Sequence, residues 1–258
     1  MVIDRFVQAC SADERIVAAF LGGSVARGEA DEFSDLDLCL ITRDDALEEV
    51  KTGREALIRT LGDPLFLEDF GRDVNVFFIR ADGTEGEIFF FGESELDRID
   101  AGPVHTLLDE QGLLADVWFP VREPDRAEQV EELRRVLHWF WHDLSHFIAA
   151  LGRGQLWWAA GQLEMLRAYC VNLERIDQGV EAEAEAYEKL DQLIAIDRLA
   201  PIRSTFPPME RDAMLQASQT LVAFFRERAP VVGREHGLSY PLELEHVISN
   251  RLGELTRT

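Results

Sequence analysis

The hydrophobic pattern of this chain changes period near residue 120, and that change limits the folds that it can adopt. Before this point apolar residues form short runs or alternate with polar ones, as in LDLCLIT at 36–42. After it they recur every three or four residues, starting near Val130. Alternation is typical of strands, and the longer period is typical of amphipathic helices. The sequence therefore predicts an α+β chain, with a strand-rich domain at 1–120 followed by a helical bundle domain at 121–258.

The first domain carries the signals of a β-sheet with a helix packed on it. Runs rich in β-branched, aromatic and other apolar residues predict strands at 15–22, 36–42, 74–79, 87–91 and 105–114. The runs at 74–79 and 87–91 flank a polar turn with glycine and therefore predict a hairpin. In EIFFF at 87–91 every residue after the first is apolar, so we expect this strand to lie inside the sheet. The spacing of apolar residues at 44–61 predicts one helix.

The second domain has helical spacing almost throughout. Prolines and glycines divide it into segments, and we expect helices at about 125–152, 155–176, 182–199, 209–229 and 241–255. Pro201 and Pro230 are expected to interrupt this pattern. Two prolines and a cluster of charges in WFPVREPDR at 118–126 mark the boundary between the domains.

The charge of the chain disfavours several classes of function. It has 49 acidic and 26 basic residues, a net charge of −23, and residues 1–120 alone hold 27 acidic and 10 basic groups. A surface of this sign repels phosphate backbones, so we expect no nucleic-acid partner. No apolar run approaches the ~18 residues of a membrane span. The three cysteines show no paired spacing, which fits a reducing cytoplasm.

The stretch LGGSVARGEADEFSDLDLCLI at 21–41 carries the clearest chemical signal. Asp35 and Asp37 stand two apart at the start of a predicted strand, so their carboxylates project from the same face. Two carboxylates at that spacing repel each other unless a cation lies between them, and hard oxygen ligands favour Mg²⁺ or Mn²⁺. Gly23 lets the backbone approach a ligand, and Ser24 with the following amides can hold phosphate oxygens. Phosphate and magnesium together indicate a nucleoside triphosphate.

The motif GGSVARGEADEFSDLDL resembles the signature of nucleotidyltransferases related to DNA polymerase β. In the antibiotic-modifying branch the chain looks most similar to lincosamide nucleotidyltransferases and more distantly to aminoglycoside nucleotidyltransferases. The similarity extends through DERIVAAFLGGS, GTEGEIFFFGESELDRI and the ALGRG turn. It implies a catalytic domain with a mixed sheet, a helical domain that completes the substrate cleft, and transfer of a nucleoside monophosphate from a triphosphate such as ATP to a hydroxyl of a small molecule, with release of pyrophosphate.

A site of this kind needs a third carboxylate on a neighbouring strand, beside the metal ligands Asp35 and Asp37. The resemblance places the third acid on the second hairpin strand, which gives Glu87 as the candidate and also as a metal residue. An acid that leads into a central apolar strand is costly unless it is used, which also favours Glu87. Asp73, which opens the other hairpin strand, is the alternative. Whether Glu87 is a metal ligand or a general base stays open.

Gly23, Ser24, Arg27 and Arg153 are the expected nucleotide-binding residues. We expect Ser24 to hold the terminal phosphates and Arg27 to neutralise them, with a plain surface arginine as the alternative. Arg153, in the GRG turn between the first two long helices, is expected to reach the triphosphate.

The expected partners are a nucleoside triphosphate and a small-molecule hydroxyl acceptor, an antibiotic of lincosamide or aminoglycoside type. The acidity of the chain favours a cationic acceptor. Two other functions stay open: the same fold acting on a protein or an RNA, and a module that binds a nucleotide without turnover. The sequence is compatible with either a monomer or a homodimer.

Three histidines, His138, His142 and His146, recur at steps of four along the first long helix. A pair at this spacing can bind zinc, but three such residues span about 12 Å of helix and do not share one ion. We therefore interpret them as residues that flank the apolar stripe of the helix. Trp157 and Trp158, a doublet at the start of the next helix, are interpreted as core and domain packing.

Overall fold

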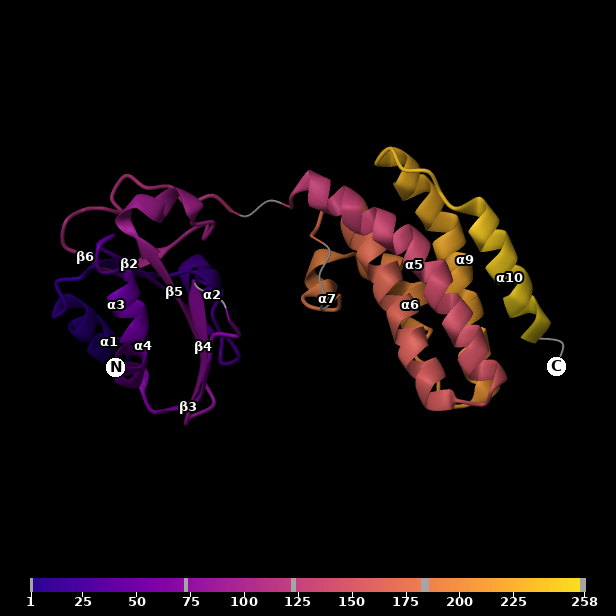
Figure 1. Ribbon diagram of the computed structural model, residues 1–258, viewed down its shortest axis with the longest axis horizontal. Helices are drawn as coiled ribbons and strands as arrows, with labels where there is room; N and C mark the ends of the chain where they lie inside the picture. Colours follow the sequence, from indigo (N-terminus) through magenta and orange to yellow (C-terminus); the bar gives the residue numbers. More distant parts are fainter. Residues whose placement is uncertain (1, 72–73, 122–123, 182–185, 256–258) are drawn as a thin grey trace. The chain divides into compact units, whose positions relative to one another are not determined.

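A computed structural model describes residues 2–71, 74–121, 124–181 and 186–255 of the chain. The chain forms two compact units, Met1–Arg122 and Glu123–Thr258, and each is described by itself (Figure 1). The first holds a six-stranded sheet with short helices, and the second is built from helices. The predicted α+β class is therefore confirmed.

The sheet of the first unit is mixed, with the strand order β3-β4-β5-β2-β1-β6. The strands are β1 (Ile16–Leu21), β2 (Leu36–Thr42), β3 (Pro64–Glu68), β4 (Asn75–Arg80), β5 (Glu85–Gly92) and β6 (His105–Asp109). The β2 and β5 strands are parallel, and every other neighbouring pair is antiparallel. The β4–β5 hairpin is confirmed, and β5 lies between β4 and β2, inside the sheet as predicted.

One face of this sheet is covered by three helices, α1 (Val2–Ser11), α3 (Leu47–Thr52) and α4 (Arg54–Leu61) (Figure 1). The side chains that this face buries include Leu38 and Leu40 of β2. The single helix predicted at 44–61 is wrong in its continuity, because Gly53 separates α3 from α4. Glycine has a low helix propensity, so the break falls where the helix is weakest.

The opposite face of the sheet carries a second core. Residues of alternate parity in β2, Cys39 and Ile41, pack there with Ile99 and Phe119 from the chain that follows β5. Two further short helices belong to this unit, α2 (Gly23–Arg27) after β1 and the 3₁₀ helix η1 (Glu93–Arg98) after β5. Since successive residues of a strand point to opposite faces, the second core defines the face on which Asp37 also lies.

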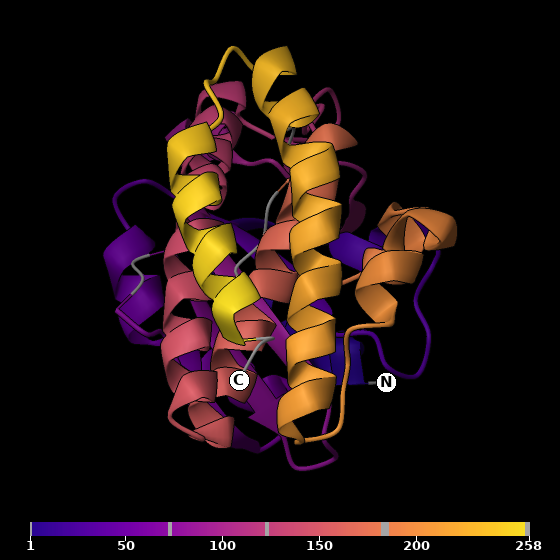
Figure 2. The same cartoon turned by 90° about the vertical axis from the view of Figure 1, so that its right-hand side faces the viewer.

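The second unit is a bundle around a long helix. Its helices are α5 (Arg126–Gly152), α6 (Leu156–Asp177), α7 (Leu190–Leu193), α8 (Ile196–Arg203), α9 (Arg211–Glu235) and α10 (Leu242–Leu255). The α5 helix packs against α6, α9 and α10, and α9 also packs against α6 and α8 (Figures 1 and 2). The apolar stripe of α5 is buried in this core, as predicted. No helix among the described residues is long and apolar enough to span a membrane.

Three predictions about the second unit were wrong. The helix predicted at 182–199 has residues 182–185 outside the described part, and in its remainder the short helices α7 and α8 are separated by a break. Pro201 does not interrupt a helix, because it lies inside α8. Pro230 does not interrupt the next helix either, because α9 continues through it to Glu235. Ala229 and Val232, on either side of this proline, are completely buried, so packing holds the helix across the missing hydrogen bond.

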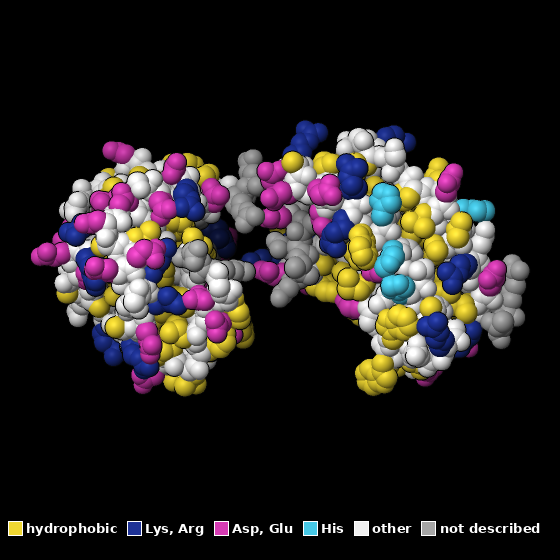
Figure 3. Space-filling model, viewed as in Figure 1, with side chains coloured by type: hydrophobic (Ala, Val, Ile, Leu, Met, Phe, Trp, Pro, Cys, Tyr) yellow, Lys and Arg dark blue, Asp and Glu magenta, His cyan; other side chains and the backbone are white. Residues whose placement is uncertain are grey.

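Acidic side chains are spread over the visible surface of the first unit and alternate there with arginines (Figure 3). Many form local ion pairs, such as Arg59 with Glu55 at 2.7 Å and Arg43 with Asp45 at 3.1 Å. Exposed pairs of this kind contribute little to stability.

Candidate active site

Asp37 and Glu87 lie opposite each other on neighbouring strands. Asp37 is the second residue of β2, Glu87 is the third residue of β5, and the parallel register pairs them directly. Residues paired in this way point to the same face of the sheet, and neighbouring strands are about 4.8 Å apart. Asp35 comes immediately before β2 and is exposed. The structure thus brings together two of the three predicted carboxylates, with the third two residues away along the chain.

The turn after β1 lies directly against Asp37. The amide of Gly22 donates a hydrogen bond to the carbonyl of Asp37 at 2.8 Å. Gly23 has a φ of +56°, and a Cβ atom added there would lie 1.6 Å from Oδ2 of Asp37. Only glycine fits, both because of this backbone conformation and because of the close approach. The close approach that the structure shows is to Asp37, so the predicted approach of this glycine to a ligand stays a prediction.

Ser24 follows this glycine at the start of α2. Its hydroxyl oxygen is buried and has no hydrogen-bond partner within the described residues. A buried hydroxyl without a partner costs about 1–3 kcal/mol. A ligand oxygen bound here would remove that cost, so the hydroxyl fits the phosphate-binding role predicted for it.

Arg27 is the last residue of α2, where its exposed side chain pairs with Glu29 at 2.7 Å. The next residue, Gly28, ends the helix with a φ of +71° and has open space around it. An exposed ion pair is worth at most about 1 kcal/mol, so Arg27 can exchange Glu29 for another anion at little cost.

Asn75 is a site residue that sequence reasoning missed. Its Nδ2 donates a hydrogen bond of 2.8 Å to Oε2 of Glu87, and Asn75 itself is only 4% exposed. The hydrogen bond crosses from β4 to β5 and fixes the position of the carboxylate. A polar residue that opens the apolar run NVFFI was the available signal. The register pairs Asn75 with Phe89, and only the side-chain hydrogen bond shows that it meets Glu87.

A pocket of about 440 Å³ opens beside Asp37 within the first unit. Gly23 and Arg27 line it together with Arg98 of η1, which pairs with Glu95. Its apolar walls come from aromatic side chains of the sheet, Phe20, Phe89 and Phe91. The pocket also includes Asp100, so two carboxylates and two guanidinium groups line it. The guanidinium groups and aromatic walls suit a ligand that has both anionic groups and a ring. The segment GTEGEIFFFGESELDRI, which contains Arg98, carried part of the family resemblance, but no role was predicted for this arginine.

The structure does not test two further predicted residues, Arg153 and Asp73. Arg153 belongs to the second unit, where it is the exposed C-cap residue of α5. Its predicted contact with the triphosphate stays a prediction. Asp73, the alternative third carboxylate, lies outside the described residues.

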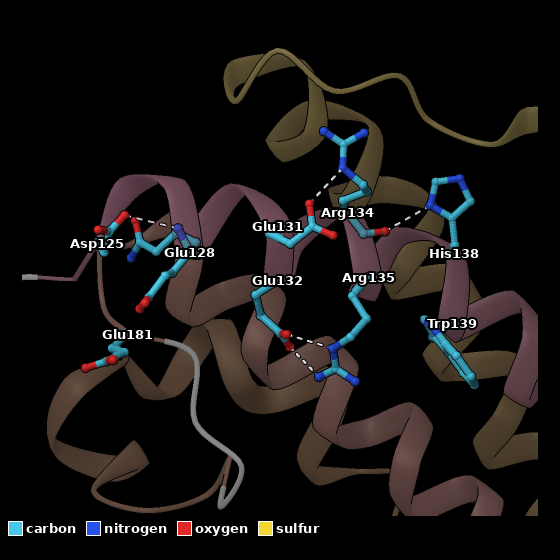
Figure 4. Close-up of a pocket in the computed structure, with 10 residues that line it drawn as sticks. Asp125, Glu128, Glu131, Glu132, Arg134, Arg135, His138, Trp139 and Glu181 are labelled. Carbon is cyan, nitrogen blue, oxygen red and sulfur yellow. Dashed lines mark hydrogen bonds and ion pairs between the residues drawn. The ribbon is translucent and has the colours of Figure 1, made fainter.

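A larger pocket, about 820 Å³, lies along the first half of α5 in the second unit (Figure 4). Five carboxylates and only two guanidinium groups line it. The guanidinium groups are already paired, Arg134 with Glu131 at 3.2 Å and Arg135 with Glu132 at 2.6 Å (Figure 4). Trp139, which is 47% exposed, closes one end. No predicted site residue lines this pocket, and its excess of negative charge suits cations.

The donor set of the first unit suits a small hard cation. Three carboxylates, Asp35, Asp37 and Glu87, offer oxygen ligands, which Mg²⁺ and Mn²⁺ prefer. Beside them, the buried hydroxyl of Ser24 has no protein partner within the described residues, and Gly23 leaves the carboxylate of Asp37 accessible from the turn. These residues therefore fit a metal-bound triphosphate.

Comparison with known proteins agrees with this chemistry. A family model described as streptomycin adenylyltransferase matches residues 1–254. The comparison with curated proteins gives no match. Among solved structures, an aminoglycoside 6-adenyltransferase from Bacillus subtilis is 16% identical, with a TM-score of 0.49 over 100% of this chain and 98% of that one. A nucleotidyltransferase-like protein from Exiguobacterium sibiricum 255-15 is 13% identical, with a TM-score of 0.43 over 89% of this chain and 74% of that one.

The family match extends over nearly the whole chain, from residue 1 to residue 254, and so includes both units. The nucleotidyltransferase resemblance seen in the sequence is confirmed, and the match falls in the aminoglycoside branch, which the sequence had placed second to the lincosamide one. The chain belongs to the streptomycin adenylyltransferase family and is a nucleotidyltransferase that modifies an antibiotic.

Proposed function

We propose that this chain transfers AMP, the nucleoside monophosphate part of ATP, to a hydroxyl group of an aminoglycoside antibiotic, in a reaction that depends on Mg²⁺ or Mn²⁺. The observation that carries the proposal is the direct pairing of Asp37 with Glu87 while Gly23 lies against the Asp37 carboxylate. The family supports the reaction class. The metal, the nucleotide and the residue roles are the proposed part.

Asp35, Asp37 and Glu87 are the proposed metal-site residues, with Glu87 held in place by Asn75. When bound, Mg²⁺ would neutralise negative charge on the triphosphate and on the departing pyrophosphate. The acceptor hydroxyl attacks the α-phosphorus as the bond to pyrophosphate breaks, and a carboxylate of the site accepts the hydroxyl proton. Because the carboxylates belong to a sheet, their positions are set before the substrate arrives, and little reorganisation is needed.

The phosphate groups are assigned to the turn after β1. We assign the hydroxyl of Ser24 as a donor to a phosphate oxygen, since it is buried beside Gly23 and has no partner within the described residues. Arg27 and Arg98, which line the same pocket, supply positive charge for the rest of the triphosphate. Arg153 of the second unit is retained in the proposal as a further contact.

A cationic acceptor is favoured by the charge of the chain. Its net charge of −23 attracts cations at long range, and the pocket along α5 adds a local excess of carboxylates. Aminoglycosides carry several amino or guanidino groups, so their charge is complementary. In this proposal residues 1–120 form the catalytic domain, and the helical domain at 121–258 contributes to acceptor binding. The three free cysteines fit a cytoplasmic enzyme.

The experiment is a screen of pyrophosphate release with Mg²⁺ and each nucleoside triphosphate in turn. The acceptors are streptomycin, other aminoglycosides and lincosamides, and mass spectrometry identifies any product. We expect release with ATP and an aminoglycoside, together with a product heavier by one nucleoside monophosphate. The proposal is contradicted if pyrophosphate is released only with a lincosamide, or if the nucleotide is transferred only to a protein or an RNA. It is also contradicted if the chain binds a nucleotide but releases no pyrophosphate.

A further inference from the structure

A second group of metal-binding side chains lies on α5, apart from the carboxylates of the first unit. His142, Asp143 and His146 offer ligand atoms that all lie within 4.8 Å of one another. The imidazole rings of His142 and His146 have centroids 4.4 Å apart. Residues four apart stand one above the other on the same face of a helix. The two histidines therefore lie side by side on one face of α5, with ligand atoms close enough to be candidates for one shared ion.

Asp143 holds the ring of His142 in a defined orientation. Nδ1 of His142 donates a hydrogen bond to Oδ1 of Asp143 at 2.7 Å, since an ionised carboxylate only accepts. The other oxygen, Oδ2, accepts a hydrogen bond from the hydroxyl of Tyr169 on α6 at 2.8 Å. Asp143 is only 7% exposed, so this carboxylate is fixed between two helices. With its proton on Nδ1, His142 presents the lone pair of Nε2 for a metal.

The second histidine, His146, is also partly exposed and can bind an ion. His146 makes no hydrogen bond within the described part of the chain, and its ring lies beside that of Trp158, with centroids 6.0 Å apart. Trp139 contacts the ring of His142, with centroids 4.7 Å apart. Histidine side chains are exposed beside hydrophobic ones on the visible face of this unit (Figure 3). An ion from solvent can therefore reach the pair.

We propose that His142 and His146 bind one divalent transition metal ion of the zinc and nickel class, with Asp143 as the residue that orients His142. Two imidazoles favour these ions over Mg²⁺, which prefers oxygen ligands. A carboxylate that accepts from the non-ligating nitrogen is the usual support of a metal-bound histidine. Water completes the coordination. His138, one turn earlier, is not part of the group whose ligand atoms lie within 4.8 Å of one another, and its Nδ1 donates instead to the carbonyl of Arg134 at 2.9 Å. The sequence interpretation placed all three histidines beside the apolar stripe. In the present proposal two of them, His142 and His146, bind the ion and His138 does not.

The site is tested by titrating the full chain, without a polyhistidine tag, with ZnCl₂ in isothermal calorimetry. Excess Mg²⁺ is present throughout to occupy the carboxylates of the first unit. We expect about one Zn²⁺ per chain, which His142→Ala and His146→Ala each abolish. His138→Ala is the matched control, since it removes an exposed histidine from the same helix, and it should leave the affinity unchanged. Because both pair residues are at least partly exposed, their loss is expected to leave the circular dichroism spectrum unchanged.

A second variant tests the orienting role. Asp143→Asn can still accept from Tyr169, but its amide then faces His142 and favours the other tautomer, which puts the proton on Nε2. We expect it to weaken Zn²⁺ binding by about 10–100-fold. Quenching of tryptophan fluorescence by Ni²⁺, lost in His142→Ala, gives an independent reading through Trp139 and Trp158. The proposal fails if Zn²⁺ binding survives in the double variant lacking both histidines, if the wild-type chain binds none, or if His138→Ala loses as much affinity as His142→Ala.

Discussion

Replacing Gly23 by alanine isolates the contact between the turn and the carboxylate of Asp37. The new Cβ would lie 1.6 Å from Oδ2, whereas real Cβ contacts are essentially never shorter than 3.0 Å, so this oxygen must move by at least 1.4 Å. A misplacement of about 1 Å at a reacting centre can cost on the order of 10²-fold in rate. The alanine also adopts a φ of +56°, which costs about 1–2 kcal/mol of stability.

Gly28→Ala is the matched control for this variant. Gly28 has a φ of +71° and nothing within 4 Å of its added Cβ, so the substitution imposes the same backbone strain without any clash. Both variants should lose about 1–2 kcal/mol of unfolding free energy in urea titrations. Only Gly23→Ala should lose about 10²-fold in kcat/KM for pyrophosphate release. Equal activity losses in the two variants, or full activity in Gly23→Ala, would refute the placement of Asp37 at the reacting centre.

Three further outcomes are expected. Asn75→Ala removes the hydrogen-bond donor to Glu87. Because a hydrogen bond to a charged group is worth about 1.5–3 kcal/mol, kcat in steady-state assays should fall about tenfold or more. A normal kcat would show that Asn75 is not part of the site. The kcat/KM of a cationic acceptor should fall as ionic strength rises from about 0.01 to 0.15 M, because the Debye length shrinks from about 30 to 8 Å, whereas an uncharged analogue should show no such fall. Burial raises the pKa of Asp177, but the hydrogen bond from Arg198 and the charges of Arg228 and Arg198 outweigh it and leave the pKa below its usual value. Its stabilising effect is then present above the unfolded pKa of about 3.9 and is lost as the pH falls through the lower folded pKa, so Asp177→Asn should flatten the acid side of a plot of unfolding free energy against pH.

The sequence was informative where local pattern and burial agree. The alternation in LDLCLIT predicted β2 with the bounds that the structure gives, and EIFFF was placed correctly inside the sheet. The β3 strand was missed because it is short, begins with a proline and lies largely exposed at the sheet edge. The α1 helix was missed although Phe6 and Cys10, one turn apart, are both completely buried. The helix has only ten residues, so its apolar pattern is short.

In the candidate site, too, local features were predicted from the sequence and contacts between distant segments were not. The spacing of Asp35 and Asp37 is local, so it was visible in the sequence. The pairing of Asp37 with Glu87 depends on strand order and register, which no single segment specifies. Asn75 and Arg98 entered the site only through contacts between elements distant in sequence. Local signals also misled at Gly53 and Pro230. The glycine divides a predicted helix, whereas the proline lies in a well-packed helix and does not end it.

The central claim, that Asp37 belongs to a metal-dependent centre for nucleotidyl transfer, is tested most directly by Asp37→Asn. The substitution keeps the size of the side chain and removes its charge. Wild type and variant would be assayed side by side with Mg²⁺, ATP and streptomycin, with the modified antibiotic quantified by mass spectrometry. Loss of a metal ligand removes several kcal/mol of charge stabilisation, so we predict a rate lower by on the order of 10³-fold. A variant that forms the product at the wild-type rate would contradict the assignment.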